Sequence, residues 1–290
     1  MVAEYFGYIS LTIWILVFLL FILQVLIIVA RHALFFPDIK YSTLLHIRLI
    51  SVAYGFILPG QLATEGVRAY LLGKGGGGYS RSGTAIVMDK IMSLVGMLLL
   101  GIIGLFFSNT LGYGIMYVFL FSCILLILIL FSLHFSFFYS AVIEVLNYLA
   151  KKAIWLNKLV KHGIILIDLW RDFSKNKQLM IKSFIYGLLF HLFGSVVGSL
   201  LSYGVGAEFN FFDWLWIHAL STFVLMIPIS LGGLGIREGT LIGLLGMIAI
   251  SPEQALAISF SFLALMLIQA LTGVAIELVL IFKRKKESRR

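Results

Sequence analysis

The sequence predicts an all-α polytopic membrane protein that forms a single transmembrane domain over residues 1–290. Hydrophobic residues make up 61% of the chain and charged residues only 12%, whereas soluble domains are nearer half apolar and a quarter charged. Several apolar runs reach the roughly 20 residues that a helix needs to cross about 30 Å of hydrocarbon. The Lys and Arg residues gather in short segments between those runs, a pattern that sets the topology of membrane proteins.

Five segments are long and apolar enough to be full transmembrane helices. They are 9–30, 84–107, 113–133, 183–203 and 252–282. Ser251 stands directly before the last of them, where its hydroxyl can cap the first turn.

Two further apolar regions are interrupted, and we expect each to form a re-entrant or broken-helix hairpin. The first covers residues 49–72, and the second begins at Phe211. Irregular backbone is tolerated at membrane depth only where it is buried in protein or lines a cavity. The backbone positions expected to shape the two hairpins are Pro59, Gly60, Gly66, Pro228, Gly232, Gly233 and Gly235.

The basic segments predict the orientation. Residues 139–182 hold eight Lys or Arg residues against three acids, with apolar residues at helical spacing. This pattern fits a basic amphipathic helix on an anionic leaflet and fits an ordinary cytoplasmic loop equally well. With the loop 73–81 and the C-terminal tail also cytoplasmic, we expect a plasma-membrane protein with its N-terminus outside and its C-terminus in the cytoplasm.

An internal repeat is the sharpest feature of the sequence. Pro59–Arg68 (PGQLATEGVR) aligns without gaps on Pro228–Arg237 (PISLGGLGIR). The predicted topology places the two copies in opposite orientations, so residues 8–107 and 183–282 are expected to be inverted repeats. The span 113–133 and the basic segment 139–182 link them. Transporters built in this way bind substrate near the midplane, where interrupted helices meet.

Charged side chains of the repeat form the predicted substrate site. An arginine in a hydrocarbon segment costs about 2.5 kcal/mol or more, so it normally has a partner and a purpose. Arg68 and Arg237 are expected to bind an anionic head group, because a guanidinium suits phosphate and carboxylate oxygens. Glu65 and Glu238 are the expected neutralising partners, and Asp89 with Lys90 extends the network. The alternatives are structural Arg–Glu pairs and, for Asp89 and Lys90, a pair at the membrane interface.

Other classes of site have little support. No nucleic-acid-binding motif accompanies the net charge of +9, and no nucleotide-binding motif is present. The six histidines are scattered without metal-ligand spacing, so we expect no metal, cofactor or catalytic residue. His191 and His218 are assigned to helix packing.

At these motifs the chain resembles the transmembrane region of lysylphosphatidylglycerol synthases, a flippase-like domain family. The resemblance rests on Leu58-Pro59-Gly60, on Glu65–Leu72 (EGVRAYLL) and on Pro228–Gly239 (PISLGGLGIREG). The family's Asp-Arg pair is matched by Asp89-Lys90, with lysine in place of arginine. The resemblance implies lipid translocation, and we expect a stand-alone member without the synthase domain.

The predicted function is therefore a flippase or scramblase, not an enzyme. It would move an anionic phospholipid, an aminoacylated lipid or a polyprenyl-phosphate-linked lipid between leaflets. The alternatives are a membrane glycosyl or lipid transferase that uses a polyprenyl-phosphate carrier, and a non-catalytic subunit of such an enzyme. The lipid, the direction and energy source of transport and homo-oligomerisation stay open, as does whether the two hairpins fully cross the membrane, which would give nine spans.

Overall fold

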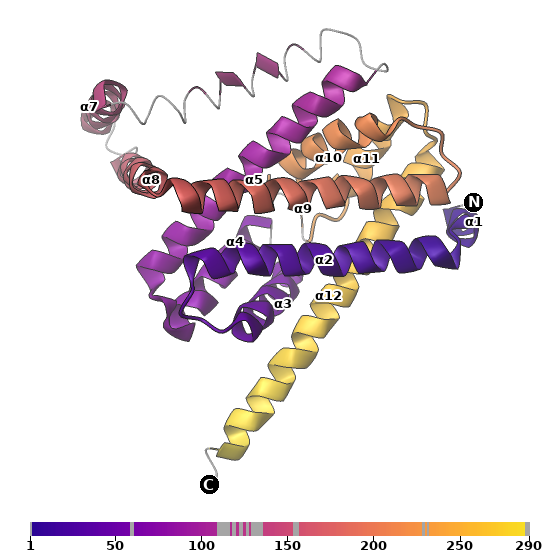
Figure 1. Ribbon diagram of the computed structural model, residues 1–290, viewed down its shortest axis with the longest axis horizontal. Helices are drawn as coiled ribbons and strands as arrows, with labels where there is room; N and C mark the ends of the chain where they lie inside the picture. The colour runs from indigo at the N-terminus through magenta and orange to yellow at the C-terminus, as the bar shows by residue number, and fades with distance from the viewer. Residues whose placement is uncertain are drawn as a thin grey trace.

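The computed structural model describes residues 2–58, 61–108, 136–152, 157–227, 230 and 232–287, with isolated positions between 117 and 128. Every regular element in these ranges is helical (Figure 1). In chain order the elements are α1 (Val2–Tyr8), α2 (Leu11–Phe35), α3 (Tyr41–Ile57), α4 (Gln61–Leu72), the π-helical turn η1 (Gly73–Gly77), α5 (Tyr79–Phe107), α7 (Ser136–Lys152), α8 (Asn157–Lys175), α9 (Lys177–Gly204), α10 (Phe211–Leu225), α11 (Ile236–Gly246) and α12 (Pro252–Glu287).

Four helices, α2, α5, α9 and α12, are long and apolar enough to cross a membrane. They match four of the five predicted spans and confirm an all-α, multi-pass membrane protein. The fifth predicted span, 113–133, lies outside the described residues apart from isolated positions. The predicted end of the first span at Ala30 is too early: α2 continues to Phe35, because Arg31 and His32 are buried by neighbouring helices.

Polar side chains cap the starts of three long or central helices. The Asn176 side chain accepts from the Leu179 amide at 3.0 Å at the start of α9. Asn210 and Asp213 form a reciprocal capping box on α10. At α12 the Gln254 amide donates to Ser251 Oγ at 3.3 Å, as the sequence predicts. These side chains satisfy amides that have no partner within the helix.

The predicted hairpins correspond to the short helix pairs α3–α4 and α10–α11. Three of the glycines in the second pair adopt positive φ, at 58° for Gly232, 82° for Gly233 and 80° for Gly235, which is the backbone conformation that favours glycine. Gly66 differs from its prediction, because it lies inside α4 and shapes no turn. Pro59, Gly60 and Pro228 lie outside the described residues.

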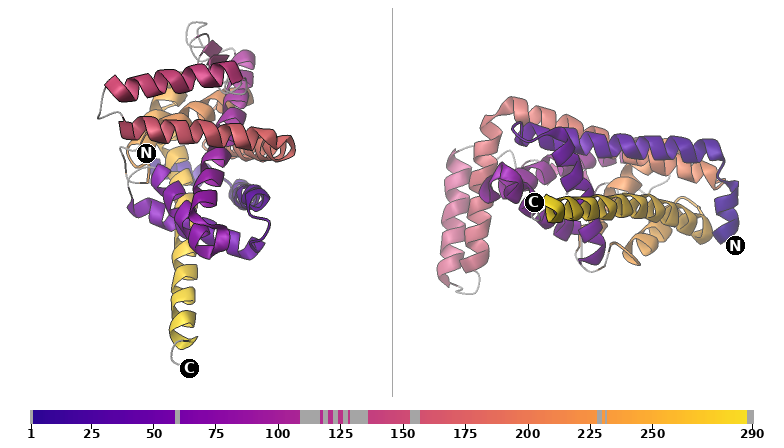
Figure 2. Two further views of the ribbon diagram at one scale, coloured as in Figure 1. Left: turned by 90° about the vertical axis from the view of Figure 1, so that its left-hand side faces the viewer. Right: turned by 90° about the horizontal axis from the view of Figure 1, so that it is seen from below.

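The two sets of helices pack on each other reciprocally. Each consists of a long helix, two short helices and a second long helix: α2 to α5, then α9 to α12. The first long helices, α2 and α9, lie side by side (Figures 1 and 2). The second long helix of each set packs on the first short helix of the other, so that α5 contacts α10 and α12 contacts α3.

A glycine at the same place in each set permits these crossings. Gly104 and Gly273 each follow the motif arginine of their set by the same number of residues. A Cβ atom on Gly104 would lie 2.7 Å from the Phe212 carbonyl oxygen of α10, and one on Gly273 would collide with the Leu49 carbonyl oxygen of α3. Small residues at helix crossings let backbones approach closely.

The basic segment 139–182, predicted as an amphipathic helix or a cytoplasmic loop, is largely helical. It consists of α7 and α8, which lie antiparallel, and of the first turn of α9. Figure 2 shows the two helices crossing the direction of α2 and α9 at one end of the bundle. Exposed apolar residues such as Phe137 and Tyr148 accompany the exposed lysines of these helices, a composition suited to a membrane surface.

A buried cationic cluster

Helices α2 to α5 bring together a group of charged side chains that we call the cationic cluster. Its members are Arg31, His32, Arg48, Glu65, Arg68, Asp89 and Lys90. The same helices contribute Val29, Leu44 and Met88 to an apolar core, and Arg31, Arg68 and Asp89 are themselves buried, so their charges interact strongly.

Asp89 anchors one end of the cluster. Its carboxylate accepts a hydrogen bond from Arg31 Nη2 at 2.8 Å and makes a second contact with Arg31 Nε. His32 Nε2 lies 3.5 Å from the same carboxylate. Asp89 is only 3% exposed, so its carboxylate is enclosed by neighbouring helices. Its ion-pair partner comes from α2 rather than from the motif arginine.

Arg68 forms the centre of the cluster. It is 1% exposed, and its Nη1 donates to Glu65 Oε2, one turn earlier on α4, at 2.5 Å. Its Nε donates to Ser51 Oγ of α3 at 3.4 Å. The predicted Arg68–Glu65 pair is therefore present. Arg68 Nη2, in contrast, is buried without a hydrogen-bond acceptor among the described residues.

Positive charge exceeds negative charge in the cluster. The cations are Arg31, Arg48, Arg68 and Lys90, and the carboxylates are those of Glu65 and Asp89, so two positive charges remain when His32 is neutral. Arg48 has no ion pair within the described part of the chain, and its Nε is buried without an acceptor. Arg48 and Lys90 are half-buried, and an anion beside them would offset this excess positive charge.

The free donors define the chemistry that the cluster can perform. Nitrogen atoms of Arg31, Arg48 and Arg68 are buried without hydrogen-bond acceptors among the described residues. Guanidinium groups match the oxygens of phosphate and carboxylate, and such charge-assisted hydrogen bonds are about twice as strong as neutral ones. The cluster is therefore suited to binding one anionic group.

Arg237 and Glu238 lie in a different environment. Arg237 Nη2 donates to the Gly232 carbonyl oxygen at 2.8 Å, within its own turn. Glu238 accepts from the Gly235 amide at 2.5 Å and from Ser259 Oγ of α12 at 3.0 Å. Glu238 thus caps α11 instead of pairing with Arg237 in this structure. Arg237 Nη1 is buried without an acceptor among the described residues.

Three members of the cluster were not singled out from the sequence. Arg31 and His32 directly follow the first predicted span, 9–30, and Arg48 directly precedes the first predicted hairpin, 49–72. The helices α2 and α3 bring them beside Asp89 and Arg68. The spacing in the sequence puts Arg48 one helical turn before Ser51, on the same side of α3. Which side of α3 faces Arg68 of α4 depends on tertiary packing, so the sequence alone did not place Arg48 in the cluster.

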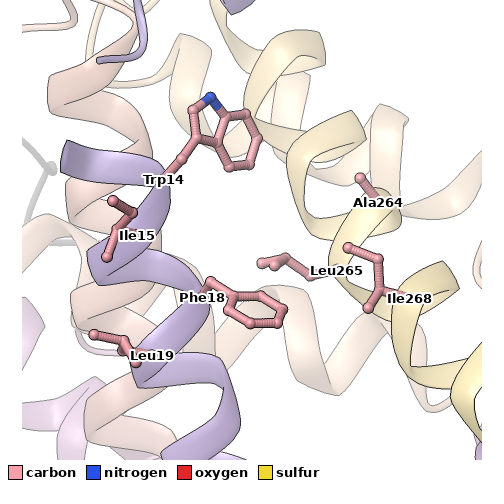
Figure 3. Close-up of a pocket in the computed structure, with 7 residues that line it drawn as sticks. All are labelled: Trp14, Ile15, Phe18, Leu19, Ala264, Leu265 and Ile268. Atoms are coloured by element: carbon pink, nitrogen blue, oxygen red, sulfur yellow. The ribbon is translucent and has the colours of Figure 1, made fainter. Parts of the chain in front are cut away.

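An apolar groove of about 330 Å³ separates α2 from α12 (Figure 3). Side chains from the first turns of α2 and from the middle of α12 line it: Trp14, Ile15, Phe18, Leu19, Ala264, Leu265 and Ile268. It has no charged lining residue, so it suits hydrocarbon and not a head group. The charged chemistry belongs to the cationic cluster, at the other end of α2.

The described residues include no group of three or more His, Cys, Asp or Glu side chains placed to hold a metal ion. The model of the family described as lysylphosphatidylglycerol synthase TM region matches residues 5–273. The chain therefore belongs to this family of lipid-related transmembrane proteins. Comparison with curated proteins and with solved structures gave no match.

Proposed function

We propose that this protein is a lipid transporter that moves an anionic lipid between leaflets and binds its head group in the cationic cluster. The observation that supports this most directly is the excess of positive charge in the cluster, with guanidinium nitrogens of Arg31, Arg48 and Arg68 that lack acceptors among the described residues. A phosphate oxygen would satisfy these donors and offset the charge. Transport, and not catalysis, is the activity proposed.

The substrate class follows from the same chemistry. A phospholipid, an aminoacylated lipid and a polyprenyl-phosphate-linked lipid all present a phosphate next to long apolar chains. Membership of the lysylphosphatidylglycerol synthase TM region family supports a lipid substrate. The proposal therefore commits to the phosphate and leaves the remainder of the head group to experiment.

The proposed orientation places the cluster near the cytoplasmic leaflet. The N-terminus is outside and the C-terminus is in the cytoplasm of a plasma-membrane protein, because Lys and Arg favour cytoplasmic segments. Arg31 and His32 lie near the end of α2, and Asp89 lies in the first half of α5. A head group would thus enter from the cytoplasmic leaflet.

Alternating access is the proposed mechanism. We infer that α2–α5 and α9–α12 are inverted repeats, a reading that the reciprocal packing of α5 on α10 and α12 on α3 supports. Arg68 is buried, so a head group reaches it only after the two sets of helices move relative to each other. Arg237 is the proposed second contact, since its Nη1 is also free of an acceptor among the described residues.

Head-group accessibility in proteoliposomes tests this proposal. Vesicles that contain fluorescent phosphatidylglycerol or fluorescent phosphatidylcholine would be compared for wild type, Arg68→Ala and Arg237→Ala. We expect wild type to move the anionic lipid faster, and both variants to lose this movement while inserting normally. Equal movement by wild type and empty vesicles, with or without an ion gradient, would contradict transport and favour a transferase or a subunit.

A further inference from the structure

A second group of polar side chains lies in the middle of the bundle, close to the cationic cluster but not part of it. His191 lies midway along α9 and is 3% exposed. Its Nε2 is 3.0 Å from Ser93 Oγ of α5, and its Nδ1 is 3.2 Å from His218 Nε2 of α10. Three different helices therefore contribute to one continuous hydrogen-bonded chain in the interior of a membrane protein.

Close helix crossings bring these three side chains within hydrogen-bonding distance. A Cβ atom on Gly187 would lie 3.0 Å from the Cα of Ser93, and one on Gly194 would lie 2.6 Å from Cε1 of His218. Glycine at both positions lets α5 and α10 approach α9 closely. Polar side chains in a membrane interior are costly, and such groups commonly lie on ion or proton pathways.

The hydrogen bonds between Ser93, His191 and His218 can run in either of two directions. With the Ser93 hydroxyl as donor to His191 Nε2, the Nδ1–H of His191 donates to His218 Nε2. In the reverse arrangement His218 donates to His191, and His191 donates to Ser93 Oγ. A protonated His191 is satisfied as well, because its two N–H groups face the lone pairs of Ser93 and His218. The site therefore accommodates one extra proton without leaving a donor unpaired.

The charged groups nearest His191 belong to the cationic cluster. Arg31 of α2 lies against α9 one turn before His191, since a Cβ atom on Gly187 would lie 3.1 Å from Arg31 Nη1. Lys90 precedes Ser93 by one turn of α5, and α10 contributes His218. Gln24 of α2 is the neighbouring neutral polar group, and it donates to the Phe190 carbonyl oxygen at 2.9 Å. An anion bound beside Arg31 and Lys90 brings negative charge close to His191, and a nearby negative charge favours the protonated imidazole.

We propose that His191, bonded to Ser93 and His218, takes up one proton when an anionic head group enters the cationic cluster, so that the lipid and a proton are carried together. This inference rests on the proposed lipid transport. The proton comes from water on the side of entry, forms an N–H bond on the imidazole, and returns to water when the head group leaves. Ser93 and His218 act as the acceptors that stabilise the imidazolium.

Thermodynamic linkage between proton binding and lipid binding sets the sign of the pH dependence of lipid affinity. If the complex holds one proton more than the free protein, lipid affinity rises as the pH falls, and the proton affinity of the lipid complex exceeds that of the free protein by the same factor. The dissociation constant then increases up to about tenfold for each pH unit in the range where histidine titrates. A phosphodiester keeps its single charge throughout that range, so the lipid itself contributes no slope.

Binding of short-chain lipid to the purified full chain in non-ionic detergent tests the proposal. The probes are dioctanoylphosphatidylglycerol and, as the zwitterionic control, dioctanoylphosphatidylcholine, titrated calorimetrically between about pH 5 and 8. We expect phosphatidylglycerol affinity of wild type to fall by about tenfold or more as the pH rises. His191→Gln, which keeps a hydrogen-bonding side chain, should bind with little pH dependence. His46→Gln on α3 is the matched histidine control and should keep the wild-type slope.

A second measurement needs only the wild type. Addition of saturating phosphatidylglycerol in weakly buffered solution should take up close to one proton per chain, reported by a pH-sensitive dye. A dissociation constant without pH dependence, a slope retained by His191→Gln, or no proton uptake on binding would each overturn the proton proposal and leave lipid transport standing. Absence of phosphatidylglycerol binding at every pH would overturn both.

Discussion

Arg48→Gln is the most direct perturbation of the cationic cluster. Arg48 has no carboxylate partner within the described part of the chain, and its Nε lacks an acceptor. Removal of its charge therefore leaves no carboxylate unpaired, unlike removal of Arg68, which would leave Glu65 alone. Arg68 and Arg31 repel Arg48 while Glu65 and Asp89 attract it, so these interactions partly cancel in the lipid-free protein.

The expected loss of head-group affinity in Arg48→Gln is that of one hydrogen bond to a charged group. A hydrogen bond to a charged group contributes about 1.5–3 kcal/mol, so loss of one such bond to phosphate weakens head-group binding by roughly 10- to 150-fold. The free energy of unfolding should change by less than about 1 kcal/mol, because no native ion pair is lost.

Calorimetric titration of dioctanoylphosphatidylglycerol, together with the thermal midpoint of the purified protein, measures both quantities. Arg81→Gln is the control, since Arg81 is an exposed arginine paired with exposed Asp38, and its loss should leave the affinity nearly unchanged. Wild-type affinity in Arg48→Gln would refute the placement of the head group in this cluster. A large loss of stability with unchanged affinity would assign Arg48 to folding.

Three further outcomes are expected. Asp89→Asn should lower the free energy of unfolding by about 3–5 kcal/mol, because it leaves the buried guanidinium of α2 without a counter-ion; thermal denaturation in detergent measures this. Gly104→Val should reduce the yield of folded protein through collision with α10, whereas Gly83→Ala, which meets open space, should not; size-exclusion profiles compare the two. The hydrogen bond from Tyr139 to Asp168 raises the pKa of the Tyr139 phenol. The stabilising effect of this hydrogen bond is therefore complete below about pH 10 and is lost as the pH rises through the raised pKa. Ultraviolet titration of wild type and Tyr139→Phe should show that Tyr139 ionises at a higher pH than an ordinary tyrosine, and Asp168→Asn should remove this difference.

The sequence determined the class and the arrangement of spans. Apolar runs near 20 residues long must become helices in hydrocarbon, because only internal hydrogen bonds satisfy the backbone there. The same local logic placed Arg68 beside Glu65, since residues three apart on a helix are neighbours. It also located the glycine turn before α11, where Gly232, Gly233 and Gly235 adopt positive φ.

Only the tertiary structure decided which distant polar groups meet. The ion pair of Arg31 with Asp89, the hydrogen bond of Arg68 to Ser51 and the contact of His191 with His218 depend on how the helices rotate and cross. A helix presents a new face every 100° along the chain, so a sequence shows the periodicity of each helix but not its register against a neighbour. Crossings at glycines such as Gly187 and Gly194 fix that register, and with it the positions of the buried charges.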